Sequence, residues 1–179
     1  MRKTAIAVSL VAGCVALPVL ADDFNIPARK PGEWRVEMVS GNPRLPGLTA
    51  SPPPKNESFE LCLDAASDKP MMQFGTAMAG STCDVSAPTQ SGGAYSFDAT
   101  CTAGRLKTKA HTVVSGDFQS AYTMKITTEI LSGPSPMPMR DVLTLNATWV
   151  GECKGLVPGE MVMPGGMKTN VLEAMKPAH

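Results

Sequence analysis

The sequence predicts a mainly β protein of the α+β class. We expect a curved antiparallel sheet or partly open barrel of about seven strands, with one or two short helices and disulfide staples. Three observations favour this class. Short segments with alternating apolar and polar residues recur along the chain. Turns containing glycine and proline separate these segments. Four cysteines remain once an apolar leader is set aside, and this even number suits two disulfides.

The first 21 residues have the pattern of a secretory signal peptide. Arg2 and Lys3 give a positive start, residues 4–20 carry no charge, and small residues precede Asp22. The uncharged run is short for a membrane span, which needs about 20 apolar residues. We therefore expect cleavage between Ala21 and Asp22, and a soluble periplasmic product.

A second interpretation concerns Cys14. The letters VAGC at residues 11–14 resemble a lipobox, in which the cysteine becomes the lipid-bearing first residue of the mature chain. This alternative makes the protein a lipoprotein anchored through Cys14. It leaves an apolar core of only residues 4–11, and the apolar run continues past the cysteine to Leu20. Cleavage after Ala21 is therefore preferred.

The mature chain has the length of one domain and a nearly balanced charge. Removing 21 of 179 residues leaves 158, and losing Arg2 and Lys3 leaves 14 basic against 16 acidic residues. No basic block favours nucleic acid, and no second long apolar run favours a transmembrane segment. We expect one β-rich disulfide domain over 22–153. A tail over 154–179 follows, containing methionine, proline and glycine.

The first two strands are expected on either side of a long loop. In residues 33–39 the apolar positions alternate with charged ones, which is typical of a half-buried strand. Residues 41–57 carry five prolines and two glycines and predict an exposed loop. Residues 58–63 predict the second strand, with Cys62 on the face opposite Leu61.

A short helix is expected next, followed by five strands. Asp68 can cap the helix, Met71 and Met78 lie on its apolar stripe, and Gly80 ends it. Glycines 92 and 93 then predict a hairpin. The remaining elements are listed in order: strands at 82–88, 94–102, 106–114, 120–131 and 140–153, and a second short helix at 168–176.

The disulfide pairing has three solutions for four cysteines. We favour Cys62–Cys83, which would clamp the helix to the sheet, together with Cys101–Cys153, which would join two inward-facing positions on late strands. A rival pairing stays open. Cys83 and Cys101 are almost symmetrical about the glycine turn, so the hairpin would place them opposite each other.

The order of these features resembles the bacterial exported family known as domain of unknown function 3617. The resemblance rests on PGEWRVEM near the mature start, then CLD, CDV, YSFDATC and a terminal GEC. It covers roughly residues 29–153. It implies an exported, short protein, and it brings no activity and no catalytic residues.

Catalytic motifs do not emerge from the sequence. Nucleophilic catalysis needs a nucleophile beside a base that a third group holds. His111 lies in the middle of a predicted strand between Ala110 and Thr112, and we interpret it as a surface histidine. No G-x-S-x-G or P-loop pattern occurs. We therefore expect a non-catalytic protein without a cofactor.

Three non-catalytic roles remain. The main expectation is a binding or envelope-structural module with an unknown protein or small-molecule partner in the envelope. The first alternative is copper binding by the soft thioethers of Met161, Met163 and Met167, with Met137, Met139 and His179 as additional candidates. The second alternative is a carrier for a small hydrophobic ligand, because a curved sheet with one apolar face can enclose a molecule.

Overall fold

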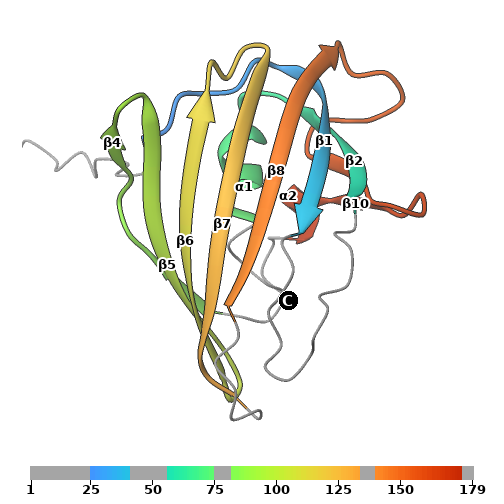
Figure 1. Ribbon diagram of the computed structural model, residues 1–179. Coiled ribbons are helices and arrows are strands. Elements are labelled where there is room, and N and C mark those ends of the chain that lie inside the picture. The colour runs from blue at the N-terminus through green and yellow to red at the C-terminus, as the bar shows by residue number, and fades with distance from the viewer. Residues whose placement is uncertain (1–24, 41–55, 75–81, 134–139, 175–179) are drawn as a thin grey trace, which may run out of the picture.

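One open antiparallel sheet of ten strands forms the framework of the computed structural model (Figure 1). The structure describes residues 25–40, 56–74, 82–133 and 140–174. The sheet order is β10-β9-β2-β1-β8-β7-β6-β5-β3, and β4 also pairs with β5. The predicted mainly β class, with short helices and disulfides, is therefore confirmed.

The element bounds follow the predicted segments closely, with three additional short strands. The strands are β1 (Gly32–Ser40), β2 (Asn56–Leu63), β3 (Thr82–Val85), β4 (Thr89–Ser91), β5 (Ala94–Ala103), β6 (Leu106–Gly116), β7 (Ala121–Ser132), β8 (Arg140–Gly151), β9 (Glu160–Val162) and β10 (Lys168–Asn170). The helices are α1 (Asp68–Phe74) and α2 (Val171–Ala174). The segment at 168–176, expected to be a helix throughout, begins as strand β10, which pairs with β9.

The long strands β5 to β8 form a meander, and β1 joins it from a distant part of the chain. Tyr95, Val114, Met124 and Leu145 are successive register partners across β5, β6, β7 and β8. β1 lies between β8 and β2, where Trp34 is the partner of both Trp149 and Leu61. The N-terminal strand is thus placed in the sheet by the last long strand.

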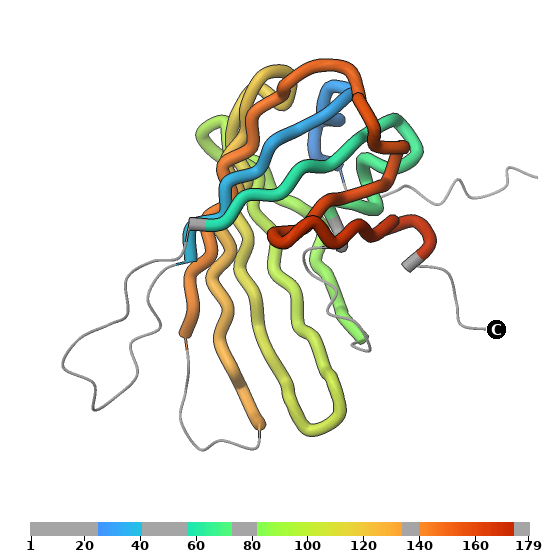
Figure 2. Tube along the Cα trace, turned by 90° about the vertical axis from the view of Figure 1, so that its right-hand side faces the viewer, coloured from blue at the N-terminus to red at the C-terminus, as the bar shows by residue number. Residues whose placement is uncertain are grey.

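The core lies on the concave side of the sheet, where β9, β10 and α1 face the long strands (Figure 2). Strand alternation decides which side chains enter it, because successive residues point to opposite faces. Trp34 and Val36 are buried, while Arg35 between them is exposed. Met72 of α1 and Val171 of α2 belong to the same buried cluster as these strand residues. The two helices therefore cover part of the concave face of the sheet.

Gly32 permits the close approach of β1 and β8. Its φ is 128°, a conformation that residues with a side chain rarely adopt. A Cβ at this position would overlap the carbonyl oxygen of Gly151 and lie 2.6 Å from Trp149 Nε1. A register shift between Glu33 and Trp34 occurs at the same place. The sequence PGEW is thus the place where β1 begins in close contact with the end of β8.

The preferred disulfide pairing is wrong, and the rival hairpin disulfide is confirmed. Cys83 is bonded to Cys101, with the Cα atoms 4.1 Å apart, and the two are direct register partners on β3 and β5. Cys62 is bonded to Cys153 instead of Cys83, with the Cα atoms 5.6 Å apart.

Sheet order explains the correction. β3 lies at one end of the sheet, and β2 lies on the far side of β1 and β8. A Cys101–Cys153 bond would have to cross from β5 past β6 and β7, about 14 Å at the usual strand spacing. A disulfide requires Cα atoms within about 7 Å. β1 begins at Gly32, so the chain after β8 can pass its end and reach Cys62.

Membrane-spanning helices do not occur in the described ranges, where no helix is both long enough and apolar enough. The expected leader at 1–21, its cleavage site at Ala21 and Asp22, and Cys14 lie outside the described residues.

Candidate ligand pocket

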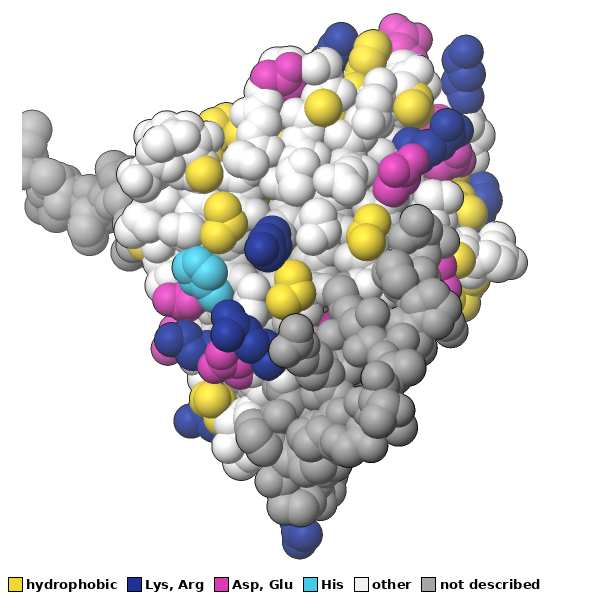
Figure 3. Space-filling model, viewed as in Figure 1, with side chains coloured by type: hydrophobic (Ala, Val, Ile, Leu, Met, Phe, Trp, Pro, Cys, Tyr) yellow, Lys and Arg dark blue, Asp and Glu magenta, His cyan; other side chains and the backbone are white. Residues whose placement is uncertain are grey.

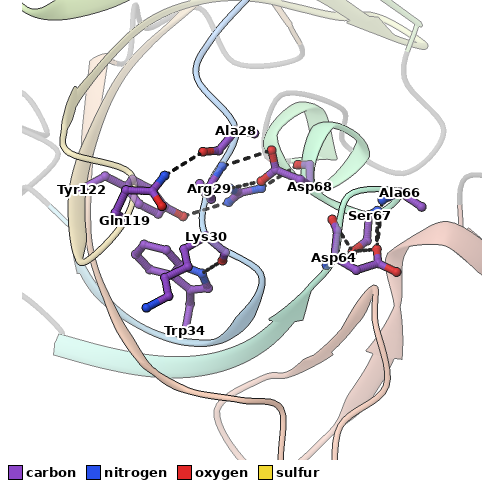
Figure 4. Close-up of polar contacts among 10 residues, drawn as sticks. All are labelled: Ala28, Arg29, Lys30, Trp34, Asp64, Ala66, Ser67, Asp68, Gln119 and Tyr122. Atoms are coloured by element: carbon purple, nitrogen blue, oxygen red, sulfur yellow. Dashed lines mark hydrogen bonds and ion pairs between the residues drawn. The ribbon is translucent and has the colours of Figure 1, made fainter.

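A buried arginine occupies the bend of the sheet. The Arg29 side chain is only 2% exposed, although it comes from the irregular segment before β1. Its Nε donates to Asp68 Oδ1 at 2.6 Å, its Nη2 donates to the Asp68 carbonyl oxygen at 2.6 Å, and its Nη1 donates to Tyr122 Oη at 2.9 Å (Figure 4). The guanidinium thereby joins three parts of the fold: the N-terminal segment, α1 and β7.

The start of α1 places Asp68 for this contact. Asp64 Oδ1 accepts hydrogen bonds from the backbone of Ala66 and Ser67 and from the Ser67 hydroxyl. Hydrogen bonds from Ser67 also lower the pKa of Asp64 below its usual value. Ser67 therefore precedes the helix, with its carbonyl accepting from Met71 N. Asp68, expected as the cap, is instead the first helical residue and its carboxylate turns to Arg29.

Aromatic side chains hold Tyr122 in position. Its ring lies 5.2 Å from the Trp34 ring and 6.0 Å from the nearly parallel Phe118 ring. The Trp34 indole donates from Nε1 to the Lys30 carbonyl oxygen at 2.9 Å. Phe118 adopts a φ of 60° in the β6–β7 turn, which directs a buried ring toward the core. These packing contacts consequently hold the Tyr122 ring in one position without a ligand.

The charge of Arg29 persists despite its burial. Burial alone lowers the pKa of an arginine, because it disfavours the charged form. Tyr122 and Asp68 oppose this through electrostatic attraction and hydrogen bonds, and the pKa of Arg29 lies above its usual value. The guanidinium is therefore a permanent cation whose charge Asp68 balances.

An apolar pocket adjoins this cluster, and we call it the methionine pocket. Its volume is about 90 Å³. Four methionines from three elements line it: Met71, Met72, Met124 and Met161. Four further apolar residues complete the wall: Val36, Phe59, Leu61 and Leu145. The polar residues in its lining are Arg29 and Tyr122.

A second hollow lies on the other side of the Arg29–Asp68 pair. Its volume is about 210 Å³, and residues from the N-terminal segment and α1 form it, including Ile26, Pro27 and Lys69. It shares Met72 with the methionine pocket and Asp68 with the ion pair. Met72 of α1 is thus part of the wall of both hollows.

The methionines expected to bind copper are not gathered in one site. Met161 is 7% exposed and lines the methionine pocket, while Met163 packs against the edge of the core. Met167 lies in the β9–β10 turn and is 66% exposed. Met137, Met139 and His179 lie outside the described residues. Within the described ranges, no three His, Cys, Asp or Glu side chains are grouped to hold a metal ion.

His111 lies on the outer face of the sheet, as the sequence predicts. Its Nδ1 is 3.0 Å from Asp98 Oδ1, and both side chains are about half exposed. The neighbouring row contains Lys109, Glu129 and Arg140, which are successive partners across β6, β7 and β8. Figure 3 shows this histidine beside a group of acidic and basic side chains on an otherwise mixed surface. Such exposed pairs contribute little to stability.

Alternation in β7 puts Tyr122 and Met124 on the same face as the buried Ile126, but sequence reasoning missed the role of Arg29. Arg29 precedes a proline and a glycine in a segment without periodicity, so no pattern marks it as buried. The available signal was weak. It consisted of a basic pair, Arg29 and Lys30, just before the first strand, and an acidic residue, Asp68, at the start of a helix 39 positions later.

Comparison with known proteins gives one match. The family model described as "Protein of unknown function (DUF3617)" matches residues 29–153. No curated protein and no solved structure matches the chain. The matched range begins at Arg29 and ends at Cys153, so it includes the buried arginine, Asp68, Tyr122 and all four disulfide cysteines.

Proposed function

The chain belongs to the DUF3617 family, and we propose that it is an exported, non-catalytic binding protein for a small apolar molecule. The observation that carries this proposal is the methionine pocket. Ligand sites are typically apolar hollows with a few well-placed polar groups. Here eight apolar residues and the pair Arg29 and Tyr122 form such a lining.

Methionine side chains suit an adaptable pocket. They are unbranched and flexible, and they can repack around ligands of different shape. A cavity of about 150 Å³ holds benzene, so the methionine pocket, at about 90 Å³, admits a probe of six non-hydrogen atoms only if its lining side chains move. Movement of Met71 and Met72 on the short helix α1 would admit a larger molecule. The hydrophobic carrier is thus favoured over the copper site, whose three methionines have different environments.

Export is part of the proposal. The leader pattern at residues 1–21 supports it, as do the two disulfides, because such bonds persist in oxidising compartments. We expect the intact mass of the protein isolated from the host envelope to equal that of a chain that begins at Asp22. A diacylglyceryl adduct on Cys14 would instead establish the lipoprotein alternative.

Ligand binding is tested with methylcyclopentane, a compact apolar probe. The mature, disulfide-bonded protein is labelled with ¹³C at the methionine methyl groups and titrated with the probe. We expect saturable shifts at Met71, Met72, Met124 and Met161, and none at the exposed Met167. Absence of saturable shifts at the four pocket methyls would refute the proposal.

Two variants separate the pocket from general hydrophobic binding. Leu145→Trp fills the pocket and should abolish the shifts, with Met124→Phe as a milder filling if the first variant folds poorly. Thr144→Trp, on the opposite face of the same strand, is the matched control and should bind as the wild type does. Native mass spectrometry of protein from the envelope then identifies a molecule that co-purifies.

A further inference from the structure

The Tyr122 hydroxyl has an unused donor at the polar end of the methionine pocket. A tyrosine hydroxyl offers one hydrogen to donate and can also accept. Tyr122 Oη accepts from Arg29 Nη1 at 2.9 Å. Arginine has no acceptor, so it cannot take the hydroxyl hydrogen in return. Within the described residues, no group accepts that hydrogen, although Tyr122 is only 6% exposed.

The neighbouring acceptors receive hydrogen bonds from other donors, and none of them accepts from Tyr122 Oη. Asp68 uses Oδ1 for Arg29 Nε, Oδ2 for the Arg29 backbone N–H, and its carbonyl oxygen for Arg29 Nη2. The Lys30 carbonyl accepts the Trp34 indole N–H. A buried donor without an acceptor is unfavourable, so a ligand that supplies an acceptor gains affinity by binding there.

We propose that the ligand of the methionine pocket is a small neutral molecule with an apolar body and one hydrogen-bond acceptor, which takes the hydroxyl hydrogen of Tyr122. This inference rests on the proposed function and specifies its ligand class. A ketone, ether or ester carbonyl has the required chemistry. The contact with Arg29 polarises the Tyr122 hydroxyl and strengthens it as a donor.

The local charge balance favours a neutral ligand. Arg29 is the cation at this end of the pocket, and its charge is balanced by Asp68 at 2.6 Å. A carboxylate ligand would place a second negative charge beside Asp68 in a buried environment, which is unfavourable. A primary ammonium ligand would place a second positive charge beside the buried guanidinium of Arg29, and the two charges would repel each other. The acceptor is therefore an uncharged atom, and a ketone, ether or ester oxygen meets this requirement.

The experiment compares two probes of the same size, cyclopentanone and methylcyclopentane. Both are titrated against the methionine-labelled mature protein and against Tyr122→Phe. Each probe is compared with itself in the two proteins, so the different hydration of the two molecules cancels. We expect Tyr122→Phe to weaken cyclopentanone about tenfold, the loss of one buried hydrogen bond, and to change methylcyclopentane less than twofold.

The second tyrosine of the chain provides the matched control. Tyr95 packs edge-on against Phe118, with 6.0 Å between ring centroids, and does not line the methionine pocket. Tyr95→Phe should leave the affinity for both probes unchanged. Equal weakening of both probes by Tyr122→Phe, or no weakening of the ketone, would overturn the assignment of the acceptor to Tyr122.

A measurement on the wild-type protein covers the case in which Tyr122→Phe folds poorly. The carbonyl stretch of bound ¹³C-labelled cyclopentanone should lie at the lower frequency typical of a hydrogen-bonded ketone. A stretch at the frequency found in alkane solvent overturns the inference. If neither probe binds the wild type, the proposed function fails and the inference falls with it. If both bind but the carbonyl has no hydrogen bond, only the inference fails.

Discussion

Arg29 and Asp68 share three hydrogen bonds: 2.6 Å from Nε to Oδ1, 2.6 Å from Nη2 to the Asp68 carbonyl oxygen, and 3.3 Å from the Arg29 backbone N–H to Oδ2. The two residues are 39 positions apart in the chain. Their contact fastens α1 to the segment that precedes the first strand. The wall of the methionine pocket formed by Met71 and Met72 depends on this attachment.

Removing the buried arginine should strongly destabilise the protein. Arg29→Leu leaves the Asp68 carboxylate partly buried without its partner, and breaking such a pair costs about 3–5 kcal/mol. The matched control is Arg35→Leu. Arg35 pairs with Glu60 at 3.1 Å on the outer face, where the side chains are 56% and 41% exposed, so its loss should cost no more than about 1 kcal/mol. Urea unfolding with intact disulfides measures the free energy of unfolding of both variants. An equal loss of stability in the two variants would contradict the role assigned to Arg29.

Acid should destabilise the protein through the β6–β7 turn. The pKa of Asp117 lies well below its usual value because the Ser120 hydroxyl, followed by backbone N–H groups of Ser120, Ala121 and Gln119, donates to its carboxylate. A carboxyl group with a lowered folded-state pKa stabilises the fold above its unfolded pKa. This stabilisation is lost as the pH falls below about 4 toward the folded-state pKa.

The variant Asp117→Asn tests this pH dependence. The wild-type free energy of unfolding should fall as the pH drops from about 5 toward 2, and the variant should show a shallower fall. Ser120→Ala removes the strongest donor and should raise the pKa of Asp117, as ¹³C NMR of the carboxyl group would report. An unchanged slope in Asp117→Asn would show that other carboxylates govern the acid sensitivity.

Thr112 should gain stability when its hydroxyl is removed. Its side chain is fully buried on β6, and no group in the part of the chain that the structure describes forms a hydrogen bond with Oγ1. Thr112→Val keeps the shape and removes the unpaired group, so we expect a gain of about 1 kcal/mol. The exposed Thr148→Val on β8 should change stability by less than about 0.5 kcal/mol. A destabilised Thr112→Val would indicate that the hydroxyl has a partner, such as a bound water.

The two disulfides should differ in their effect on stability. Cys62 and Cys153 are 91 residues apart, whereas Cys83 and Cys101 are 18 apart. In the chain-entropy model, loops of these lengths correspond to about 4.5 and about 3 kcal/mol. Replacing each pair by alanines and measuring denaturant unfolding tests the difference. Non-reducing peptide mapping of the wild type must first recover both linked pairs, and a Cys62–Cys83 peptide would contradict the structure.

The long strands were predictable because each carries a local signal. In β7, Tyr122, Met124 and Ile126 alternate with polar residues, and the structure buries all three. The hairpin disulfide was within reach for the same reason, since Cys83 and Cys101 flank one turn symmetrically. β9 and β10 have three residues each, too few for a period of two to be distinguished.

The features that sequence reasoning missed depend on which strands become neighbours. The Cys62–Cys153 bond requires β1 to lie between β2 and β8, and no local pattern near either cysteine encodes that order. The methionine pocket is similar. The sequence placed Met71 on the apolar stripe of a helix and Met161 among the candidate copper ligands. Only the bend of the sheet and the position of α1 bring these two methionines together with Met124 at one cavity.

The place of β1 between β2 and β8 also sets an order of assembly. A chain that emerges from its N-terminus presents Trp34 long before Trp149, its partner in the sheet. The meander β5 to β8 joins neighbours in sequence and can form early, together with the Cys83–Cys101 bond. β1 can complete its pairing only after β8 exists, and the Cys62–Cys153 bond must follow. Oxidative folding should therefore accumulate a one-disulfide species that contains the hairpin bond, and the last bond to form should join β2 to the segment that follows β8.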